Sequence, residues 1–379
     1  MRRILIVSNH FFPYKGGLEN FALEMGKGLL KKGIQVDVLT FNYNKLKDKE
    51  KIEGMNVIRI PCISILGETY SLPVFGKKYK TLIKEVLLNK YDTLFTNTRF
   101  FTISFLGLIY SKILKKNNKN LKYIHIEHGN RYVIHSNPVV TMIAWLYDQT
   151  LGRIIFSSAD TVIGISKPCV DFSKRLGAKK TTVIYNSIHT ALFKKKKTNL
   201  REKLGIKKDE LVIINGVGRL IYAKGLQDTI TATKDMKNVV VITIGWGPYK
   251  EKLEAYAKAN NVKTIFTGIL NQKKVIEYLS IADIFINPSY SEGLPTCVLE
   301  AGAMGLPVIA TDVGGTREII SNKDEGILFK PKDITEVKNN ITLLSKNKKL
   351  RQKLGENIKK KIRNKFDWET SIKKIEEII

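Results

Sequence analysis

Hydrophobic residues recur along this chain in two alternating patterns: short β-branched runs and longer runs with helical spacing. Near-continuous short apolar runs are typical of parallel strands that are buried on both faces. In the first half of the chain, the runs that predict strands are Ile4–Ser8, Gln35–Thr40, Val57–Pro61, Thr93–Thr96, Tyr123–Glu127, Thr161–Ser166 and Thr182–Tyr185. Amphipathic segments separate these runs, so we expect an α/β fold with a parallel sheet.

The same alternation starts again in the second half. The expected strands there are Leu211–Gly216, Val239–Gly245, Thr264–Thr267, Ile284–Asn287, Val308–Thr311 and Ile327–Phe329. The charged stretch from Phe193 to Asn199 lies between the two series and is expected to be a linker. The pattern therefore predicts two doubly wound domains, residues 1–192 and 193–363. Ligands of such sheets bind at the carboxyl ends of the strands, so we expect the site in a cleft between the domains.

Length and cysteine content agree with two intracellular domains. The 379 residues exceed what one ordinary core organises. The three cysteines are Cys62, Cys169 and Cys297. Their wide spacing matches neither a metal site nor a disulfide framework, and a reducing compartment is the simplest interpretation. The short apolar run that follows Arg2 and Arg3 is a strand pattern rather than a signal peptide. We therefore expect a cytoplasmic protein, either free or peripheral on the inner face of the cell membrane.

The net charge of +29 is large and is shared by both halves of the chain. Residues 1–190 hold 29 Lys and Arg against 13 Asp and Glu, and the remainder holds 35 against 22. Such a charge attracts anionic lipids, nucleic acids or phosphorylated substrates, although genome bias toward lysine explains it equally well. Aromatic residues are not interleaved with basic ones as in nucleic-acid-binding proteins, and we expect no nucleic acid partner.

One segment, residues 283–301, predicts a strand, a tight loop and a helix in succession. Glu292 lies on the loop, and Glu300 lies eight residues later inside the helix. The loop residues Gly293, Leu294, Pro295 and Thr296 lead into the helix, whose free N–H groups suit a phosphate. A diphosphate beside a carboxylate that holds hydroxyl groups is the arrangement that would bind a nucleotide sugar.

A second segment, Asn215–Gly225, places two cations after a strand that ends in glycines. Arg219 can bind a diphosphate through two N–H groups, and Lys224 adds a mobile charge. Two cations in such a loop are commonly plain surface residues, but the Glu292 and Glu300 segment in the same domain favours a functional role. Since the sequence shows no cluster with metal-ligand spacing, we expect the two cations to stabilise the leaving group and no metal to be required.

Four strand ends give weaker signals. Gly16 and Gly17 follow the first strand and would let the backbone approach a ligand closely. His128 ends the fifth strand, where a lone histidine is either structural or functional; its neighbour Glu127 is interpreted as solvated. The loops at Gly245 and Ile269 are plain turns or contacts to a base. The chain contains no G-x-G-x-x-G motif after a strand, which argues against a dinucleotide oxidoreductase.

Taken in order, these motifs resemble the retaining GT-B glycosyltransferases of family 4, the glycosyl transferases group 1. The resemblance runs along nearly the whole chain. The segments that carry it are Phe12–Gly17, Ser158–Ser166, Gly218–Gly225, Glu292–Ala301 and Phe366–Glu369. The family fold has two Rossmann-like domains that face each other across a cleft. The resemblance also implies that a C-terminal helix from about residue 364 to residue 379 completes the first domain.

The resemblance further implies roles for individual residues. Arg219 and Lys224 would hold the donor diphosphate, Glu300 the ribose hydroxyls, and Glu292 would lie near the transferred sugar. His128 would contribute to catalysis, and Gly16 or Gly17 would contact the diphosphate through backbone N–H. The donor would be a UDP- or GDP-hexose, and transfer would proceed on the front face without a protein nucleophile. The chain departs from the family at Trp246, where Asp is common, and at Ser187, where Gly is common.

The acceptor is expected to be a hydroxyl on a lipid-linked or cell-surface glycan precursor, bound by the first domain. The basic amphipathic segment Val74–Leu88 either contacts an anionic membrane through Lys77, Lys78, Lys80 and Lys84 or is a core-facing helix with a solvated basic face. The segments Phe100–Leu114 and Val139–Leu151 suit either the core or an interface. The alternatives to a glycan-building enzyme are a catalytically decayed nucleotide-sugar-binding protein and a soluble small-molecule glycoside synthase.

Overall fold

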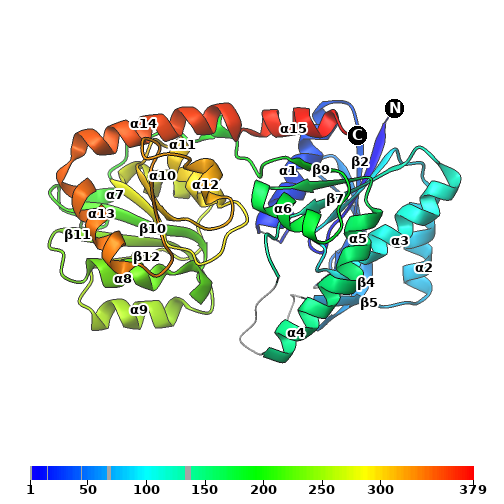
Figure 1. Cartoon of the computed structure of the whole chain (residues 1–379), viewed down its shortest axis with the longest axis horizontal. Helices are drawn as coiled ribbons and strands as arrows, with labels where there is room; N and C mark the ends of the chain where they lie inside the picture. The colour runs from blue at the N-terminus through cyan, green and yellow to red at the C-terminus, as the bar shows by residue number, and fades with distance from the viewer. Residues whose placement is uncertain (1, 15, 44, 66–69, 133–137) are drawn as a thin grey trace. The chain divides into compact units, whose positions relative to one another are not determined.

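The computed structural model describes residues 2–14, 16–43, 45–65, 70–132 and 138–379. These residues form two compact units. Unit 1 comprises Met1–Asn186 and Trp368–Ile379, and unit 2 comprises Ser187–Asp367. The sequence pattern predicts the corresponding boundaries at 192/193 and near 364. Each unit is an α/β fold around a mainly parallel sheet, as predicted (Figure 1).

In the described part of unit 1, the sheet has the strand order β3-β4-β2-β1-β6-β7-β8-β9, and β5 pairs with β4. The strands are β1 (Arg3–Val7), β2 (Gln35–Asn42), β3 (Lys49–Ile52), β4 (Met55–Ile65), β5 (Tyr70–Pro73), β6 (Thr93–Asn97), β7 (Lys122–Glu127), β8 (Thr161–Gly164) and β9 (Thr181–Val183). All neighbouring pairs are parallel except β3·β4 and β4·β5. The antiparallel strands β3 and β5 were not predicted from the sequence.

Helices cover the unit 1 sheet because its central strands are apolar on both faces; Ile4, Leu5, Ile6 and Val7 of β1 are completely buried. The helices are α1 (Gly17–Lys31), α2 (Lys77–Leu88), α3 (Thr102–Asn117), α4 (Pro138–Tyr147), α5 (Arg153–Ser158), α6 (Lys167–Arg175) and α15 (Trp368–Glu376). The C-terminal helix α15 packs on α1, where a Cβ at Gly28 would overlap the Ile372 side chain. The absence of a side chain at Gly28 therefore permits the close approach of the two helices.

In the described part of unit 2, the sheet is parallel with the order β12-β11-β10-β13-β14-β15. The strands are β10 (Leu211–Arg219), β11 (Val239–Trp246), β12 (Thr264–Phe266), β13 (Ile284–Asn287), β14 (Val308–Thr311) and β15 (Ile327–Phe329). The helices are α7 (Leu200–Lys203), α8 (Leu226–Thr233), α9 (Lys250–Ala259), α10 (Gln272–Ile281), α11 (Thr296–Ala303), α12 (Thr316–Ile319), α13 (Ile334–Lys346) and α14 (Lys348–Lys365). Figure 1 shows α8 and α9 on one side of these strands and α11 and α14 on the other.

Both sheets reverse their strand order at one point. The reversal lies between β1 and β6 in unit 1 and between β10 and β13 in unit 2. In open α/β sheets, such a switch point leaves a crevice outside the carboxyl ends of the two strands, and ligands bind there. The fold therefore directs attention to the loops that follow these four strands.

Two segments that could face either the core or a membrane, the basic amphipathic Val74–Leu88 and the apolar Val139–Leu151, differ in their surroundings. Helix α2 turns Tyr79, Leu82, Ile83 and Val86 into the core of unit 1, so its lysines form a solvated outer face. Helix α4 buries Ala144 alone among its described residues. Within the described ranges, we find no helix with the length and apolar character needed to cross a bilayer.

Candidate active site

Two loops meet at the switch point of unit 2, and the first of them joins β10 to α8. The β10 strand is irregular between Ile214 and Val217, and the chain adopts positive φ at Gly216 (76°) and Gly218 (142°). Arg219 is the last residue of β10 and is exposed, whereas Lys224 ends a short 3-10 turn at Tyr222–Lys224. The two cations predicted from the sequence thus lie at the carboxyl end of a central strand and in the loop that follows it.

The second loop follows β13 and carries Glu292. The Lys224 ammonium nitrogen lies 2.8 Å from Glu292 Oε1, and the two side chains are 29% and 10% exposed. Burial disfavours the ammonium, but the Glu292 carboxylate outweighs this effect, so the pKa of Lys224 is raised. Lys224 is therefore a fully charged ammonium held at a fixed position on the edge of the sheet.

A glycine lets the two loops approach. Gly225 has φ of 62°, and a Cβ there would overlap the carbonyl oxygen of Pro288. The Tyr290 N–H donates to the Ala223 carbonyl over 2.8 Å across the same contact. Because a side chain at position 225 would push the loops apart, Gly225 sets the separation that allows Lys224 to reach Glu292.

Helix α11 begins directly after the second loop, and Pro295 occupies its N-cap. Leu294 and Pro295 are buried, Gly293 and Thr296 are partly buried, and the Gly293 carbonyl accepts the Gly315 N–H over 2.9 Å. Glu300 lies on the second turn, and burial raises its pKa to about 7. Among the described residues its carboxyl group has no hydrogen-bond or ion-pair partner, whereas the carboxylate of Glu292 is paired with Lys224. Of the two acids, Glu300 is therefore the carboxyl available to an external donor group.

The neighbouring strand ends complete the site on unit 2. The Gly245 N–H donates to the Gly268 carbonyl over 3.0 Å, and a Cβ at Gly245 would overlap the Gly218 oxygen. Ile269 follows Gly268 and is largely exposed. A small hollow lies at the end of β10 and is lined by Gly216, Val217, Gly218, Arg219, Leu220, Lys224, Leu226 and Asn287. The structure thus collects the donor-site residues expected in the second half of the chain around one edge of one sheet.

In unit 1, the predicted residues lie on two loops at the carboxyl edge. Gly16 precedes α1 and Gly17 is its first residue; a Cβ at Gly17 would meet no atom within 4 Å. His128 follows β7 and packs edge-on against Phe21, with ring centroids 5.2 Å apart. Burial lowers the pKa of His128 to about 4, more than Glu127 raises it, so the imidazole is neutral at pH 7.

Several buried polar atoms at this edge lack a protein partner among the described residues. They are His128 Nε2, both amide atoms of Asn9, which comes two residues after β1, and both amide atoms of Asn97 at the end of β6. Buried polar groups are normally hydrogen-bonded, and leaving one unmet costs about 1–3 kcal/mol. A ligand that carries hydroxyl groups would satisfy them.

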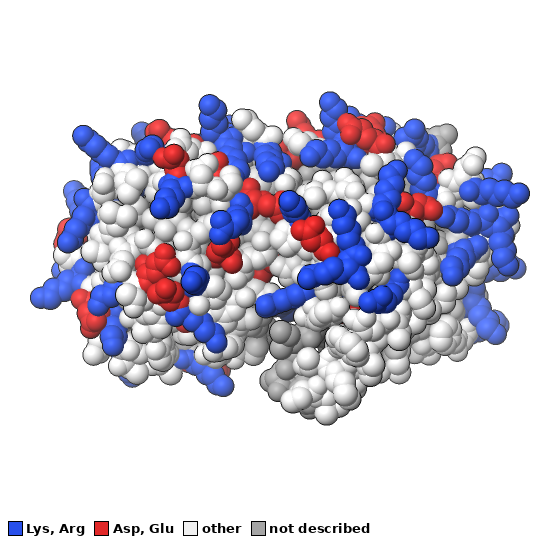
Figure 2. Space-filling model, in the orientation of Figure 1, with Lys and Arg blue, Asp and Glu red and all other residues white. Residues whose placement is uncertain are grey.

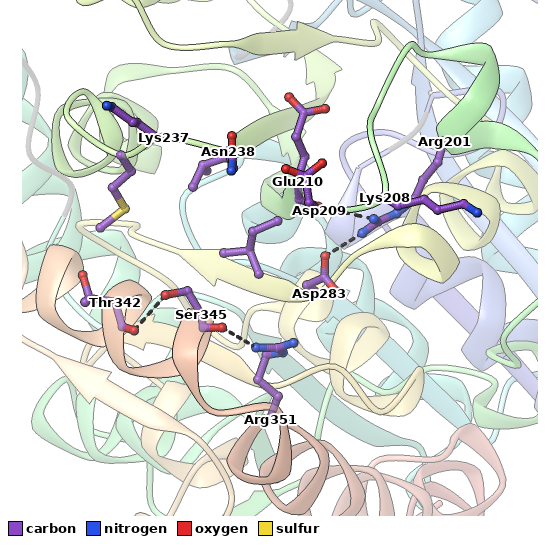
Figure 3. Close-up of a pocket in the computed structure, with 13 residues that line it drawn as sticks. Arg201, Lys208, Asp209, Glu210, Lys237, Asn238, Asp283, Thr342, Ser345 and Arg351 are labelled. Carbon is purple, nitrogen blue, oxygen red and sulfur yellow. Dashed lines mark hydrogen bonds and ion pairs between the residues drawn. The ribbon is translucent and has the colours of Figure 1, made fainter.

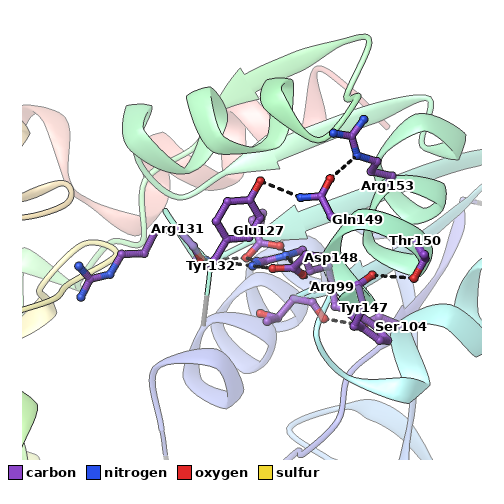
Figure 4. Close-up of polar contacts among 12 residues, drawn as sticks. Arg99, Ser104, Glu127, Arg131, Tyr132, Tyr147, Asp148, Gln149, Thr150 and Arg153 are labelled. Atoms are coloured by element: carbon purple, nitrogen blue, oxygen red, sulfur yellow. Dashed lines mark hydrogen bonds and ion pairs between the residues drawn. The ribbon is translucent and has the colours of Figure 1, made fainter. Parts of the chain in front are cut away.

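A buried ion cluster, not expected from the sequence, includes Glu127, the residue before His128; Figure 4 shows its side chains. Arg99 is 2% exposed and pairs with Glu127 over 3.0 Å and with Asp148 over 2.8 Å. Burial opposes ionisation of Glu127, but Arg99 outweighs it and the pKa of Glu127 falls to about 2. The interpretation of Glu127 as a solvated neighbour was wrong, because its side chain is completely buried.

This cluster fixes the loop that bears His128. Glu127 Oε1 accepts the N–H of Gly129 over 2.5 Å, and Glu127 Oε2 lies 3.5 Å from Nε2 of His125. Asp148 begins a π-helical turn, Asp148–Gly152, that directly follows α4. Arg99 therefore ties the His128 loop to the end of α4, and Figure 4 shows the three side chains facing one another.

A separate hollow on unit 2 carries none of the expected chemistry (Figure 3). Its lining includes Leu211 and Val239, the first residues of β10 and β11, and Asp283, which immediately precedes β13. It therefore lies at the amino ends of the strands, the edge opposite the switch-point loops. Its Arg201 side chain is paired with Asp283 over 2.6 Å.

Glycosyltransferase family models match both halves of the chain. A model described as glycosyl transferases group 1 matches residues 196–361, and a model described as glycosyltransferase family 4 matches residues 15–192. An uncharacterized glycosyltransferase of Methanocaldococcus jannaschii is 30% identical, with 99% of this chain and 97% of that protein covered.

Two further matches carry more informative names. A phosphatidylinositol N-acetylglucosaminyltransferase component from Arabidopsis thaliana is 25% identical over 87% of this chain and 71% of its own length. The crystal structure of Anabaena HepE in complex with UDP superimposes with a TM-score of 0.79 at 21% identity, covering 100% of this chain and 99% of that one. At that identity, the structural match shows the fold alone.

Proposed function

We propose that this chain, which belongs to the glycosyl transferases group 1 of glycosyltransferase family 4, transfers a hexose-type sugar from a UDP- or GDP-sugar to a hydroxyl acceptor with retention of anomeric configuration. The observation that carries the proposal is the meeting of two cations and two acids at the switch point of unit 2. Arg219 ends β10 and Lys224 lies in the loop after it, and Glu292 and Glu300 follow β13. This placement is the one in which α/β sheets bind nucleotides.

The donor diphosphate would lie over the β10 loop, where Arg219 offers a planar pair of N–H groups and Lys224 a fixed positive charge. Charge builds on the leaving oxygen as the glycosidic bond breaks, and preorganised cations stabilise that charge more in the transition state than in the ground state. The paired Glu292 holds Lys224 in place and lies beside the transferred sugar. We propose that these groups suffice without a metal ion.

The nucleoside would be held by Glu300 and by the strand-end backbone. An ionised Glu300 accepts two hydrogen bonds from ribose hydroxyls, and those bonds replace the solvation that burial removes. The N–H groups of the first turn of α11 and the backbone near Gly245 and Ile269 are available to the phosphates and the base.

On unit 1, the neutral His128 would hydrogen-bond the sugar through Nε2, and the backbone N–H of Gly16 or Gly17 would contact the diphosphate. Support comes from the unmet polar atoms of His128, Asn9 and Asn97. Because the imidazole is neutral, its contribution would be a hydrogen bond rather than a charge.

The acceptor would be a hydroxyl of a lipid-linked or cell-surface glycan precursor. The Arabidopsis relative is named for transfer to phosphatidylinositol, so at least one relative acts on a lipid. The exposed apolar side chains of unit 1, which include Met142 and Trp145 on α4, are consistent with such an acceptor.

A thermal-shift screen of the full chain against UDP, GDP and ADP tests the donor assignment, because a tight ligand raises the melting temperature by mass action. Lys224→Ala and Arg219→Ala should reduce the shift given by the best nucleotide. Lys250→Ala is the matched control, since Lys250 is also about one-third exposed and also lies 2.8 Å from a glutamate, on α9. An unchanged shift in the Lys224 and Arg219 variants would refute the site.

A second assay separates an enzyme from a decayed binding protein. The wild-type chain should hydrolyse the selected nucleotide sugar slowly when no acceptor is present, and Lys224→Ala should not. Binding without any turnover, with or without a hydroxyl acceptor, would leave nucleotide-sugar binding as the function.

A further inference from the structure

Helix α4 presents an apolar stripe to solvent. Val139, Met142, Ile143 and Leu146 have the spacing i, i+3, i+4, i+7 of one helix face, and each is 48–58% exposed. Such a stripe normally faces a protein core. Trp145 on the same helix is also exposed. In Figure 2, the lower centre of the view, where Figure 1 draws α4, shows neither acidic nor basic atoms.

A second apolar surface lies at the same edge of the unit 1 sheet. Strand β4 runs parallel to β2 only as far as Pro61 and then continues past the carboxyl edge, where it pairs with β5. The exposed apolar side chains of this extension are Ile63, Ile65, Leu72, Val74 and Phe75. Helix α4 also follows the carboxyl end of a strand, β7. The topology therefore places both apolar surfaces at one edge, which we call the apolar edge.

The charge around the apolar edge is positive. Phe75 lines a shallow hollow with Lys77, Lys80 and Lys84, whose i, i+3, i+7 spacing puts all three on one face of α2. Residues 127–158, from the end of β7 to the end of α5, include two basic residues, Arg131 and Arg153, both exposed. The two acids of that segment, Glu127 and Asp148, are completely buried against Arg99. The segment therefore contributes cations to the surface and no carboxylate.

We propose that the apolar edge is a docking surface for an anionic lipid bilayer. Apolar side chains on a short helix and a hairpin tip would enter the interfacial region, Trp145 would lie at headgroup depth, and the α2 lysines would contact lipid phosphates. A bilayer fits better than a second copy of this chain, because an isologous dimer would bring these cations against their own copies.

Docking there would also serve the transfer reaction, an advantage that rests on the proposed function. The His128 loop ends β7 at the same edge, and Arg99 joins that loop to the π-helical turn after α4. A headgroup hydroxyl at the bilayer surface would therefore meet the edge of unit 1 that carries the unmet polar atoms.

Vesicle co-sedimentation of the full chain, without nucleotide sugar, tests docking independently of activity. The vesicles are phosphatidylcholine alone or phosphatidylcholine with one-third phosphatidylglycerol. Leu146→Ser should weaken partition into the anionic vesicles roughly five- to tenfold. The control is Leu343→Ser, because Leu343 on α13 of unit 2 is equally exposed at 48%; it should leave partition unchanged.

The contribution of the lysine charges to docking is tested by substitution. Replacing Lys77, Lys80 and Lys84 with Gln should weaken anionic binding roughly 100-fold at low salt. The matched triple replacement of Lys234, Lys252 and Lys258, exposed lysines of unit 2, should weaken it far less.

The depth of insertion is tested by fluorescence quenching. In a Trp246→Phe background, lipids brominated near the headgroup should quench Trp145 fluorescence. Trp368 is 3% exposed and should stay unquenched.

Equal partition of wild type and Leu146→Ser, or no preference for anionic vesicles, would overturn the proposal. So would dimerisation in solution that Leu146→Ser abolishes while vesicle binding is absent, because the apolar edge would then be a self-association surface. Failure of the nucleotide thermal shift would leave the docking result standing, so the two proposals fail separately.

Discussion

Glu300 is a partly buried residue whose carboxyl group has no protein partner among the described residues, and replacing it with Gln should reveal a pH-dependent penalty on folding. Burial raises its pKa from the ordinary 4.5 to about 7, so between these values the folded chain binds more protons than the unfolded chain. Stability must then fall as pH rises from about 4.5 to 7, and the loss is complete above pH 7. At about 1.4 kcal/mol per unit, the loss is at most about 3 kcal/mol, because the side chain keeps some contact with solvent.

The Glu300→Gln variant has no ionisation at this position and should escape that penalty. Urea unfolding of the full chain, followed by far-UV circular dichroism, should give equal stabilities near pH 4.5 and a variant that is about 1–3 kcal/mol more stable at pH 8. The same variant should bind the selected nucleotide more weakly, because an amide accepts fewer hydrogen bonds from ribose than a carboxylate.

The control for this experiment is Glu325→Gln, which should change the stability at pH 8 in the opposite direction. Lys361 lies 2.6 Å from Glu325 and more than offsets burial, so the pKa of Glu325 is lowered. That substitution should destabilise the chain at pH 8. A stability difference between wild type and Glu300→Gln that stays constant from pH 4.5 to 8 would refute the account of Glu300.

Three further predictions follow from the loops and the buried cluster. Gly225→Ala should destabilise unit 2 by about 3 kcal/mol or more in urea unfolding and abolish nucleotide binding. The control Gly205→Ala should cost only about 1 kcal/mol. Both glycines have φ of 62°, but a Cβ at Gly205 would meet no atom within 4 Å. Lys224→Ala should lower kcat roughly 100-fold or more while Lys250→Ala does not, and equal kcat in the two variants contradicts the leaving-group role. Arg99→Met should cost about 3–5 kcal/mol in urea unfolding, because it leaves Glu127 and Asp148 buried and unpaired; a cost below about 1 kcal/mol would show that the cluster is not structurally important.

The strands buried on both faces were the most predictable part of the fold. The bounds of β13, β14 and β15 agree with the sequence expectation residue for residue, because each is a short apolar run between polar turns. The β3 segment Lys49–Ile52 was missed since an edge strand with charged residues carries no such run. The extension of β10 to Arg219 was missed because the irregularity at Ile214 and the positive φ at Gly216 interrupt the pattern without ending the strand.

In the candidate site, too, the residues next to clear strand patterns were predictable and the contacts between distant residues were not. Arg219, Lys224, Glu292 and Glu300 were proposed as site residues from the sequence, because each lies next to a clear strand pattern, and their role stays a prediction. The pairing of Lys224 with Glu292 was not predictable from spacing, since 68 residues separate them. Arg99, Glu127 and Asp148 were missed for a related reason: burial of a charged side chain depends on distant partners and leaves no local pattern. The exposure of α4 was equally hidden, because an apolar helix stripe has the same pattern whether a core or solvent faces it.

The most direct test of the central claim is a crystal structure of the full chain with the nucleoside diphosphate that the thermal-shift screen selects. We predict that Arg219 and Lys224 contact the diphosphate and that Glu300 accepts hydrogen bonds from the ribose. A nucleotide bound in the hollow at the amino ends of the unit 2 strands (Figure 3), or bound without contact to Arg219 and Lys224, would contradict the account.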